Sequence, residues 1–493
     1  MLGQFTDVVT GRKLARRPLW RVFQGASLML SLGLGGCLLT DTPEPGLDIP
    51  HAYDGSSAKP AVAEAALPKL DWWRSFHSRE LTAIIDQARA ANLDIAAAVA
   101  RIVQADASAR IAGAPLLPNI GLDGSAAHSR SSQSTGTSSG GASERDSLST
   151  TLTASYEIDF WGKNRSALRA AEETAVASRY DREVVGLTTV VTTANAYFQV
   201  LASQDRLKAA RENLKSANHV LDLIKQRVNA GTASALETAQ QESVVNTQRA
   251  SIPPLEQTLT QNRNALAVLM ARSPESMRIR GGSLRSIAIP RVTPGLPSEL
   301  LAQRPDIRKA EAQLAAANAN VENARAQMLP SITLTADGGY SSAVLKTLLR
   351  PESALYSLGA GLAQPIFDGQ KLQGNLDLKK GVQDELLQNY RKAVISGFAD
   401  VENALNGIRQ TALRERLQGD VVTSSRRAFD IAEQRLREGT IDLVTVLQTQ
   451  QTLYSAQDAL VQARLAHMQA IVSLYQALGG GWLPKPVQAV NAR

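Results

Sequence analysis

The sequence consists of two similar halves, and this repeat constrains the fold more than any other feature. The stretch NLDIAAAVARIVQADASARIAGAPLLPNI recurs as RPDIRKAEAQLAAANANVENARAQMLPSI, so that Asp94 matches Asp306 at an offset of 212 residues. Further along, RVNAGT at 227–232 matches RLREGT at 435–440 at an offset of 208 residues. Matching motifs in the same order predict two copies of one structural unit.

The residues that follow the repeated LPNI and LPSI motifs alternate between apolar and polar side chains. Segments of this kind occur near 120–126, 148–160, 332–340 and 356–366. Strict alternation predicts strands with one apolar and one polar face. The sequence therefore indicates two hairpins whose strands are about long enough to cross an outer membrane when tilted. On alternation alone, a soluble antiparallel sheet with one wet face remains an alternative.

Long helices are predicted between the strands. Residues 163–229 contain no proline and a single glycine, Gly186, and such a helix would be about 100 Å long. Apolar residues in it follow steps of three and four, which is typical of a coiled-coil seam. They are Leu207, Ala210, Leu214, Ala217, Leu221, Ile224 and Val228.

Each long helix ends at a Gly-Thr pair, Gly231-Thr232 or Gly439-Thr440, and a second helix follows within a few residues. A short connection of this kind predicts an antiparallel helical hairpin whose tip lies far from the strands. Pro253-Pro254 predicts a kink or a break in the first returning helix.

The N-terminus has the order of a secretory signal: a basic stretch, an apolar run and small residues before Cys37, the single cysteine. The apolar run is shorter than the roughly 20 residues of a spanning helix, which disfavours a retained anchor. Leu34 to Cys37 resemble the lipobox of bacterial lipoproteins, which implies a diacylglyceryl group and an N-acyl chain such as palmitate on Cys37. An unmodified thiol is the alternative. Leu38, in place of an aspartate, favours the outer membrane, and residues 37–68 would form a tether.

Charge and motif content argue against other classes of protein. The net charge is +7, and taking away the five bases and one acid of residues 1–36 leaves +3 without a basic block, which disfavours nucleic-acid binding. One cysteine and five scattered histidines give no metal-site pattern, and no catalytic or nucleotide-binding motif is present. We therefore expect no catalytic residues, no metal and a passive role in which energy comes from outside the chain.

Four strands cannot stand alone in lipid, because the two outer edges would leave backbone groups unpaired in hydrocarbon. Other copies must close the barrel. Two copies would give an eight-stranded barrel, whose interior is normally filled by side chains. Three copies would give a twelve-stranded barrel, which has room for an aqueous lumen. The sequence thus predicts a homotrimer in outer-membrane lipid.

Several motifs together resemble the TolC-like outer-membrane efflux channels, especially their lipoprotein branch. They are DWWRSF at 71–76, YEIDFWGKNR at 156–165, QRPDI at 303–307, AQPIFDGQ at 363–370 and LYQALGGGW at 474–482. The resemblance implies a mixed α/β membrane protein: a twelve-stranded trimeric barrel, a periplasmic helical tunnel, and a belt near residues 69–90, 271–303 and the segment after Gly479.

The resemblance also implies a function and partners. The expected role is a passive outlet for small molecules, coupled to a periplasmic adaptor and a proton-driven inner-membrane pump. A structural coiled-coil lipoprotein and an outlet for type I protein secretion are the alternatives. The expected division is a signal (1–36), a tether (37–68), two efflux repeats (69–295 and 296–480) and a tail (481–493).

In such channels the tunnel closes at the hairpin tips. The matching positions here are Arg435, Leu436, Asp442, Thr445 and Gln448. Family members often carry acids at the positions of Thr445 or Gln448, and this chain has none there, although Asp442 lies one turn away. We expect the planar guanidinium of Arg435 to bind a carbonyl or carboxylate of a neighbouring helix and hold the closed state. A solvated position near a helix end is the alternative for both Arg435 and Asp442.

Overall fold

A computed structural model describes Gly46 and residues 68–130, 144–290 and 303–482. The expected signal (1–36), Cys37, almost all of the tether and the tail beyond Trp482 lie outside the described residues. Residues 45–493 form one compact unit, and the description below concerns this unit.

Four antiparallel strands form one sheet in the order β1-β2-β3-β4. Their bounds are Asn119–Arg130 for β1, Glu144–Ile158 for β2, Ser331–Ser342 for β3 and Ala354–Ala363 for β4. The first and second halves of the chain each contribute one hairpin, and the hairpins join through β2 and β3. Strands β1 and β4 are the outer edges, so each has one side without a strand partner among the described residues.

The register places most of the apolar residues of all four strands on one face. Ile120 pairs with Ala154, Ala154 with Ala336 and Ala336 with Leu358. The adjacent row on the other face joins Asn119, Ser155, Thr335 and Gly359. The apolar face is open to its surroundings, since Leu122 is 74% exposed and Leu358 is 79% exposed. The alternation seen in the sequence is confirmed.

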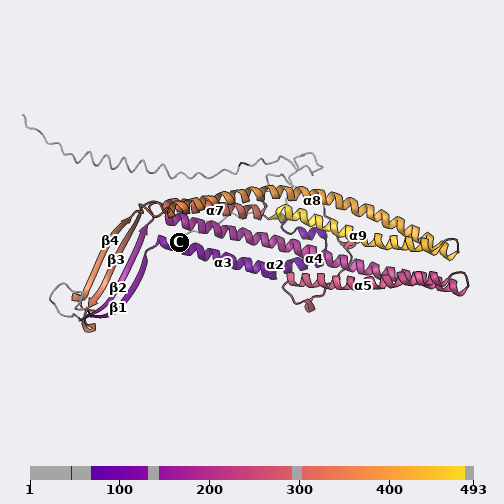
Figure 1. The fold of residues 1–493 in the computed structure, drawn as a ribbon, viewed down its shortest axis with the longest axis horizontal. Helices are drawn as coiled ribbons and strands as arrows, with labels where there is room; N and C mark the ends of the chain where they lie inside the picture. Colours follow the sequence, from indigo (N-terminus) through magenta and orange to yellow (C-terminus); the bar gives the residue numbers. More distant parts are fainter. Residues whose placement is uncertain (1–45, 47–67, 131–143, 291–302, 483–493) are drawn as a thin grey trace, which may run out of the picture. The chain divides into compact units, whose positions relative to one another are not determined.

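Long helices extend from the sheet in two similar sets. The first is α3 (Leu93–Gly113), α4 (Lys163–Asn229) and α5 (Ala235–Leu269), and the second is α7 (Pro305–Ala326), α8 (Lys371–Arg437) and α9 (Leu443–Ala477). Helix α4 has the predicted bounds, and α4 and α8 are both 67 residues long. Helices α3 and α7 pack beside the strand-proximal part of α4, and α5 and α9 flank its distal part (Figure 1). The repeat in the sequence is thus a repeat in the fold.

Of the kink or break expected at Pro253-Pro254, the break does not occur, because α5 is one helix through both prolines. The two prolines deprive the carbonyls of Arg249 and Ala250 of their helical donors. Both of these residues are exposed, so water can satisfy the freed carbonyls and the cost of the prolines is reduced.

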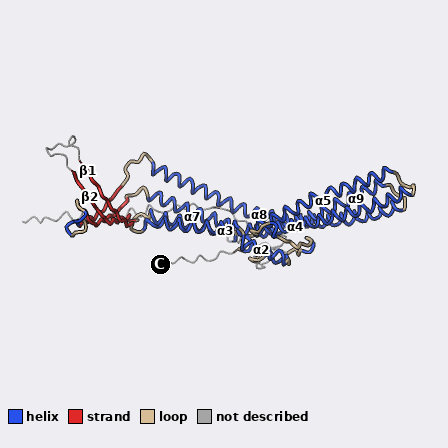
Figure 2. Tube along the Cα trace, turned by 90° about the horizontal axis from the view of Figure 1, so that it is seen from below, coloured by secondary structure: helices blue, strands red, loops and turns tan. Residues whose placement is uncertain are grey.

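A belt of short elements packs around the middle of the long helices. It contains η1 (Trp72–Phe76), α2 (Arg79–Ala91), η4 (Pro274–Ser276), η5 (Leu284–Ser286) and η8 (Gly479–Gly481). In the tube view these loops and short helices gather beside α2 and α4 (Figure 2). This grouping agrees with the belt that the resemblance implied, as far as its residues are described.

The largest apolar core lies between the belt and the helices. Trp72 stacks on Tyr475 with ring centroids 4.5 Å apart, and Phe76 meets Phe198 at 5.3 Å. In the described part of the chain, α4 is the one helix long and apolar enough to cross a membrane, and more than half of its apolar window is buried. Most of the residues from Val190 to Leu201 belong to this core, so α4 is a core helix.

Candidate functional site: hairpin tips and the belt groove

The two hairpin tips have the same turn. Thr232 donates its N–H and its hydroxyl to the carbonyl of Arg227, at 2.9 and 3.1 Å. Thr440 does the same to Arg435, at 2.9 and 3.2 Å. The intervening glycines, Gly231 and Gly439, have φ of 72° and 73°, a conformation that side chains disfavour. The Gly-Thr pairs therefore fix the turns, as the sequence indicated.

The residue that starts each returning helix is a capping residue. Ser234 caps α5 in a capping box with Glu237, and Asp442 caps α9 by accepting a hydrogen bond from the Thr445 N–H at 2.8 Å. Donation by the Thr445 backbone and hydroxyl keeps the pKa of Asp442 below its usual range. Asp442 thus stays ionised at neutral pH, at the exposed end of the hairpin.

Leu436 lies inside the protomer. It is 0% exposed and packs in a small apolar cluster, the tip core, which joins both hairpins. The members of the tip core are Val220, Ile224, Phe429, Ala432, Leu436, Leu443, Val446, Leu453 and Tyr454. Arg227 of the first hairpin also donates to the Leu436 carbonyl at 3.1 Å. The two tips are therefore held together within one chain.

Other predicted tip residues face outward. Arg435, Asp442 and Gln448 are exposed, and Thr445 is half-buried. The guanidinium of Arg435 has no hydrogen-bond or ion-pair partner among the residues that the structure describes. The structure thus brings these side chains to one tip without pairing Arg435 to Asp442.

A half-buried polar cluster that the sequence did not reveal connects α8, α9 and the belt. Glu415 accepts from Arg464 Nη1 at 2.6 Å and pairs with His467 Nδ1 at 2.7 Å. Arg464 Nε donates to the Leu284 carbonyl at 2.9 Å. No local pattern marks Glu415, which is 49 residues from Arg464, so only the packing of the two helices reveals the pair.

Burial acts to raise the pKa of Glu415, but the hydrogen bonds and charges of His467 and Arg464 outweigh it and hold the pKa below its ordinary value. A carboxyl whose folded pKa is depressed stabilises the fold above its unfolded pKa, and this contribution is lost as pH falls through the folded pKa. We therefore expect the attachment of residues 284–287 to weaken below about pH 4.5 and not between about pH 5 and 8.

Hydrogen exchange of the belt amides, corrected for the intrinsic pH dependence of exchange, measures this effect. Protection at residues 284–287 should fall on acidification of the wild type. Glu415→Gln should show reduced protection that no longer changes over the same acid range. Equal acid responses in the wild type and the variant would exclude Glu415 as the titrating group.

The acids at the end of β2 have structural partners. Glu157 pairs with Lys163, and Asp159 lies beyond the strand and accepts from the N–H groups of Asn164 and Arg165, both at 2.9 Å. Within the described ranges, no group of acids, histidines and cysteines is arranged to hold a metal ion.

These features define a class of protein. It has a sheet with an exposed apolar face and long helical hairpins with a belt around their middle, and each half of the chain supplies one strand hairpin and one set of helices. A family model described as "Outer membrane efflux protein" matches residues 84–272 and 296–480. This chain belongs to the outer membrane efflux protein family. It is an outer-membrane channel for efflux that extends into the periplasm, and the family consists of channels without catalytic activity.

Individual relatives agree with this assignment. The chain is 42% identical to the pyoverdine export outer membrane protein OpmQ of Pseudomonas aeruginosa, over 91% of this chain and 95% of that protein. It is 31% identical to the toluene efflux pump outer membrane protein TtgC of Pseudomonas putida, over 92% and 95%. The structure resembles the outer-membrane channel OprN with a TM-score of 0.84 and 26% identity, covering 91% of this chain and all of that one. The open state of MtrE from Neisseria gonorrhoeae gives 0.79 and 28%, covering 90% and 97%.

Proposed function

We propose that three copies of this chain close a twelve-stranded barrel through the outer membrane. The observation that carries this proposal is the sheet, which exposes one apolar face and leaves β1 and β4 unpaired on their outer sides. Because β1 and β4 run in opposite directions, β4 of one copy can pair antiparallel with β1 of the next. Three copies then satisfy every edge and leave a water-filled lumen lined by the polar face.

The barrel is the outlet of a tripartite system, in which a periplasmic adaptor meets the helical tips and a proton-driven inner-membrane pump supplies the energy. Small molecules are the cargo, by analogy with the compounds named for OpmQ and TtgC. A diacylglyceryl and N-acyl lipid on Cys37 anchors residues 37–68 to the same membrane. The chain divides into a signal (1–36), this tether, repeats at 69–295 and 296–480, and a tail (481–493).

Conductance tests the proposed channel. Purified full-length protein reconstituted in planar bilayers should give discrete steps of current, and removal of the Cys37 lipid should leave the protein dependent on detergent. Protein that becomes soluble without detergent once the lipid is removed, and that gives no current, would support the structural lipoprotein instead. Efflux of a small dye but no protein export in cells would separate the small-molecule outlet from type I secretion.

The repeat also suggests a partner for Arg435 at the closed tip. Arg227 occupies the equivalent place in the first half, and it donates to the carbonyl of Leu436 on the second hairpin. If each hairpin contacts the next one around the trimer in the same way, Arg435 donates to the carbonyl that corresponds to that of Leu436. Because the repeat offset is 208 residues, this is the carbonyl of Val228 in the next copy. Arg435 would then hold adjacent protomers together at the closed tip.

Arg435→Glu should raise single-channel conductance, because it removes this hydrogen-bond donor and places an acid against a carbonyl. Breaking one charged hydrogen bond per interface is worth about 1.5–3 kcal/mol, which is enough to shift a closed tip toward open states. Arg435→Lys should give an intermediate effect. Arg437→Glu, at the same tip but paired with Glu433, is the matched control, and equal conductance in all variants would remove Arg435 from the gate.

A further inference from the structure

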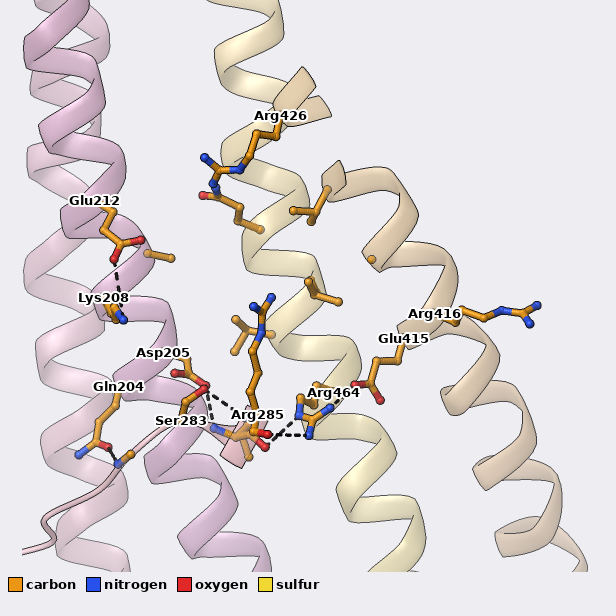
Figure 3. Close-up of a pocket in the computed structure, with 18 of the residues that line it drawn as sticks. Gln204, Asp205, Lys208, Glu212, Ser283, Arg285, Glu415, Arg416, Arg426 and Arg464 are labelled. Carbon is orange, nitrogen blue, oxygen red and sulfur yellow. Dashed lines mark hydrogen bonds and ion pairs between the residues drawn. The ribbon is translucent and has the colours of Figure 1, made fainter. Parts of the chain in front are cut away.

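A large groove lies at the level of the belt, between α4, α8, α9 and the segment around η5. Its volume is about 1180 Å³, above the range of about 300–1000 Å³ that is usual for small-molecule sites. Figure 3 shows that its lining residues come from the three helices and the belt segment. We call it the belt groove, and the residues that matter below are Lys208, Ala209, Arg285, Arg426, Leu460 and Val461.

The acids that line the belt groove are already engaged. Asp205 accepts from the Ser283 hydroxyl at 3.0 Å and from the Leu284 N–H at 2.9 Å. Glu415 is held by Arg464 and His467, and Glu212 lies 3.9 Å from Lys208. The lining as a whole is positive, because six cations (Lys208, Arg280, Arg285, Arg416, Arg426 and Arg464) outnumber these three acids. The contacts of Asp205 also hold the belt segment that forms one wall.

Most of the cations in the lining, unlike the acids, have no partner in the part of the chain that the structure describes. Arg280, Arg285, Arg416 and Arg426 are all exposed, and their guanidinium groups have no hydrogen-bond or ion-pair partner among the described residues. In Figure 3 the side chains of Arg285 and Arg426 lie over the gap between α4 and α9, whereas Arg416 points away from it. Two free guanidinium groups from different elements thus converge on the groove, and each can bind a carboxylate through two parallel hydrogen bonds.

The belt groove also has an apolar component. Ala209 of α4 and Leu460 and Val461 of α9 line the groove together with the charged side chains. A small inorganic anion would fill little of this volume and leave the apolar part of the lining uncovered. A peptide that alternates acidic and apolar residues would match both the guanidinium groups and the apolar lining.

The groove would remain accessible in the proposed trimer, and this step rests on the proposed function. Helix α8 has an exposed apolar stripe of Leu413, Leu417 and Val421, which are 41%, 51% and 45% exposed. Such a stripe suits contact with the next copy. Arg426 is nine residues from Leu417, or two and a half turns at about 3.6 residues per turn, so it lies on the opposite side of α8.

We propose that the belt groove is a docking site for an acidic, extended peptide segment of a periplasmic protein, with Arg285 and Arg426 as its carboxylate-binding groups. The site lies about 30 Å from the hairpin tip along α4, at about 1.5 Å per residue from Lys208 to Asn229. It is therefore separate from the surface where the tunnel closes.

Binding of a defined peptide to full-length protein in detergent tests this proposal. The probe is a fluorescently labelled peptide of repeated Glu-Leu-Glu-Ala units, and the same peptide with glutamine in place of glutamate is its control. We expect saturable binding of the acidic peptide alone. Arg285→Ala with Arg426→Ala should weaken it about tenfold, whereas Arg414→Ala with Arg427→Ala, which removes the same charge outside the groove, should not.

Footprinting of the wild type gives a readout that needs no variant. An arginine-specific reagent should modify Arg285 and Arg426 less when the acidic peptide is bound, with Arg414 unchanged. Equal binding of both peptides, no loss in the groove variant, or displacement by inorganic phosphate at the peptide's own concentration would overturn the proposal. Conductance should be unaffected by the groove variant, so failure here is distinguishable from failure of the channel.

Discussion

Leu122→Arg should abolish insertion of the protein into the outer membrane. Leu122 lies on β1 and is 74% exposed on the apolar face, which in the proposed barrel meets lipid. An arginine on the lipid face costs about 2–4 kcal/mol at the bilayer midplane, and three copies carry this cost together. The membrane fraction should lose the protein, and the remainder should appear as aggregates or degradation products.

Asp123→Arg is the matched control, because it changes the next residue of the same strand on the opposite face. Asp123 pairs with Thr151, in a row that would line the lumen. We expect normal insertion and a shift of ion preference toward anions in planar bilayers. Equal insertion of the Leu122 and Asp123 variants would mean that the apolar face does not contact lipid.

Leu436→Asp should open the hairpin tip. The residue is fully buried in the tip core, so the change removes apolar packing worth about 2–5 kcal/mol and buries a carboxylate without a partner. The tip core is local, and the larger core at the belt contains none of its residues. We therefore expect fraying of residues 436–446 within an otherwise intact assembly.

Two measurements check the tip variant. Protease should cut the assembled protein near residues 437–442 faster than in the wild type, and basal conductance should rise. Leu436→Met, which nearly conserves volume and usually costs less than about 1.5 kcal/mol, should behave like the wild type. A tip that stays resistant to protease after Leu436→Asp would show that the tip core does not hold the two hairpins.

The elements that could be predicted from the sequence are those whose patterns are local and long. The bounds of α4 follow from an uninterrupted helical run that ends at a Gly-Thr turn, and the four strands follow from alternation that leaves one face apolar. The repeat then fixes the correspondence between the two tips. These signals need no knowledge of what packs against them.

Other features depend on contacts between distant residues, and the sequence could not reveal them. Glu415 becomes part of a half-buried cluster only because α8 and α9 bring it to Arg464 and His467. Leu436 looks like a tip residue in the sequence, but its place in the tip core depends on Val220 and Ile224 of the other hairpin. The proline pair of α5 is another such feature, because the two residues that lose their helical donors, Arg249 and Ala250, are exposed in the fold, which the sequence does not indicate.

The central claim is that each chain supplies an incomplete barrel wall that sister copies finish. The most direct test is a pair of introduced cysteines, one on the edge strand β1 and one on the edge strand β4, at positions that would face each other between neighbouring copies. Cys37 keeps its lipid in this variant. Oxidation in outer membranes should link chains into closed trimers, and each single-cysteine variant should give none. Monomers that remain unlinked in membranes, with native mass spectrometry also showing one chain, would contradict the account.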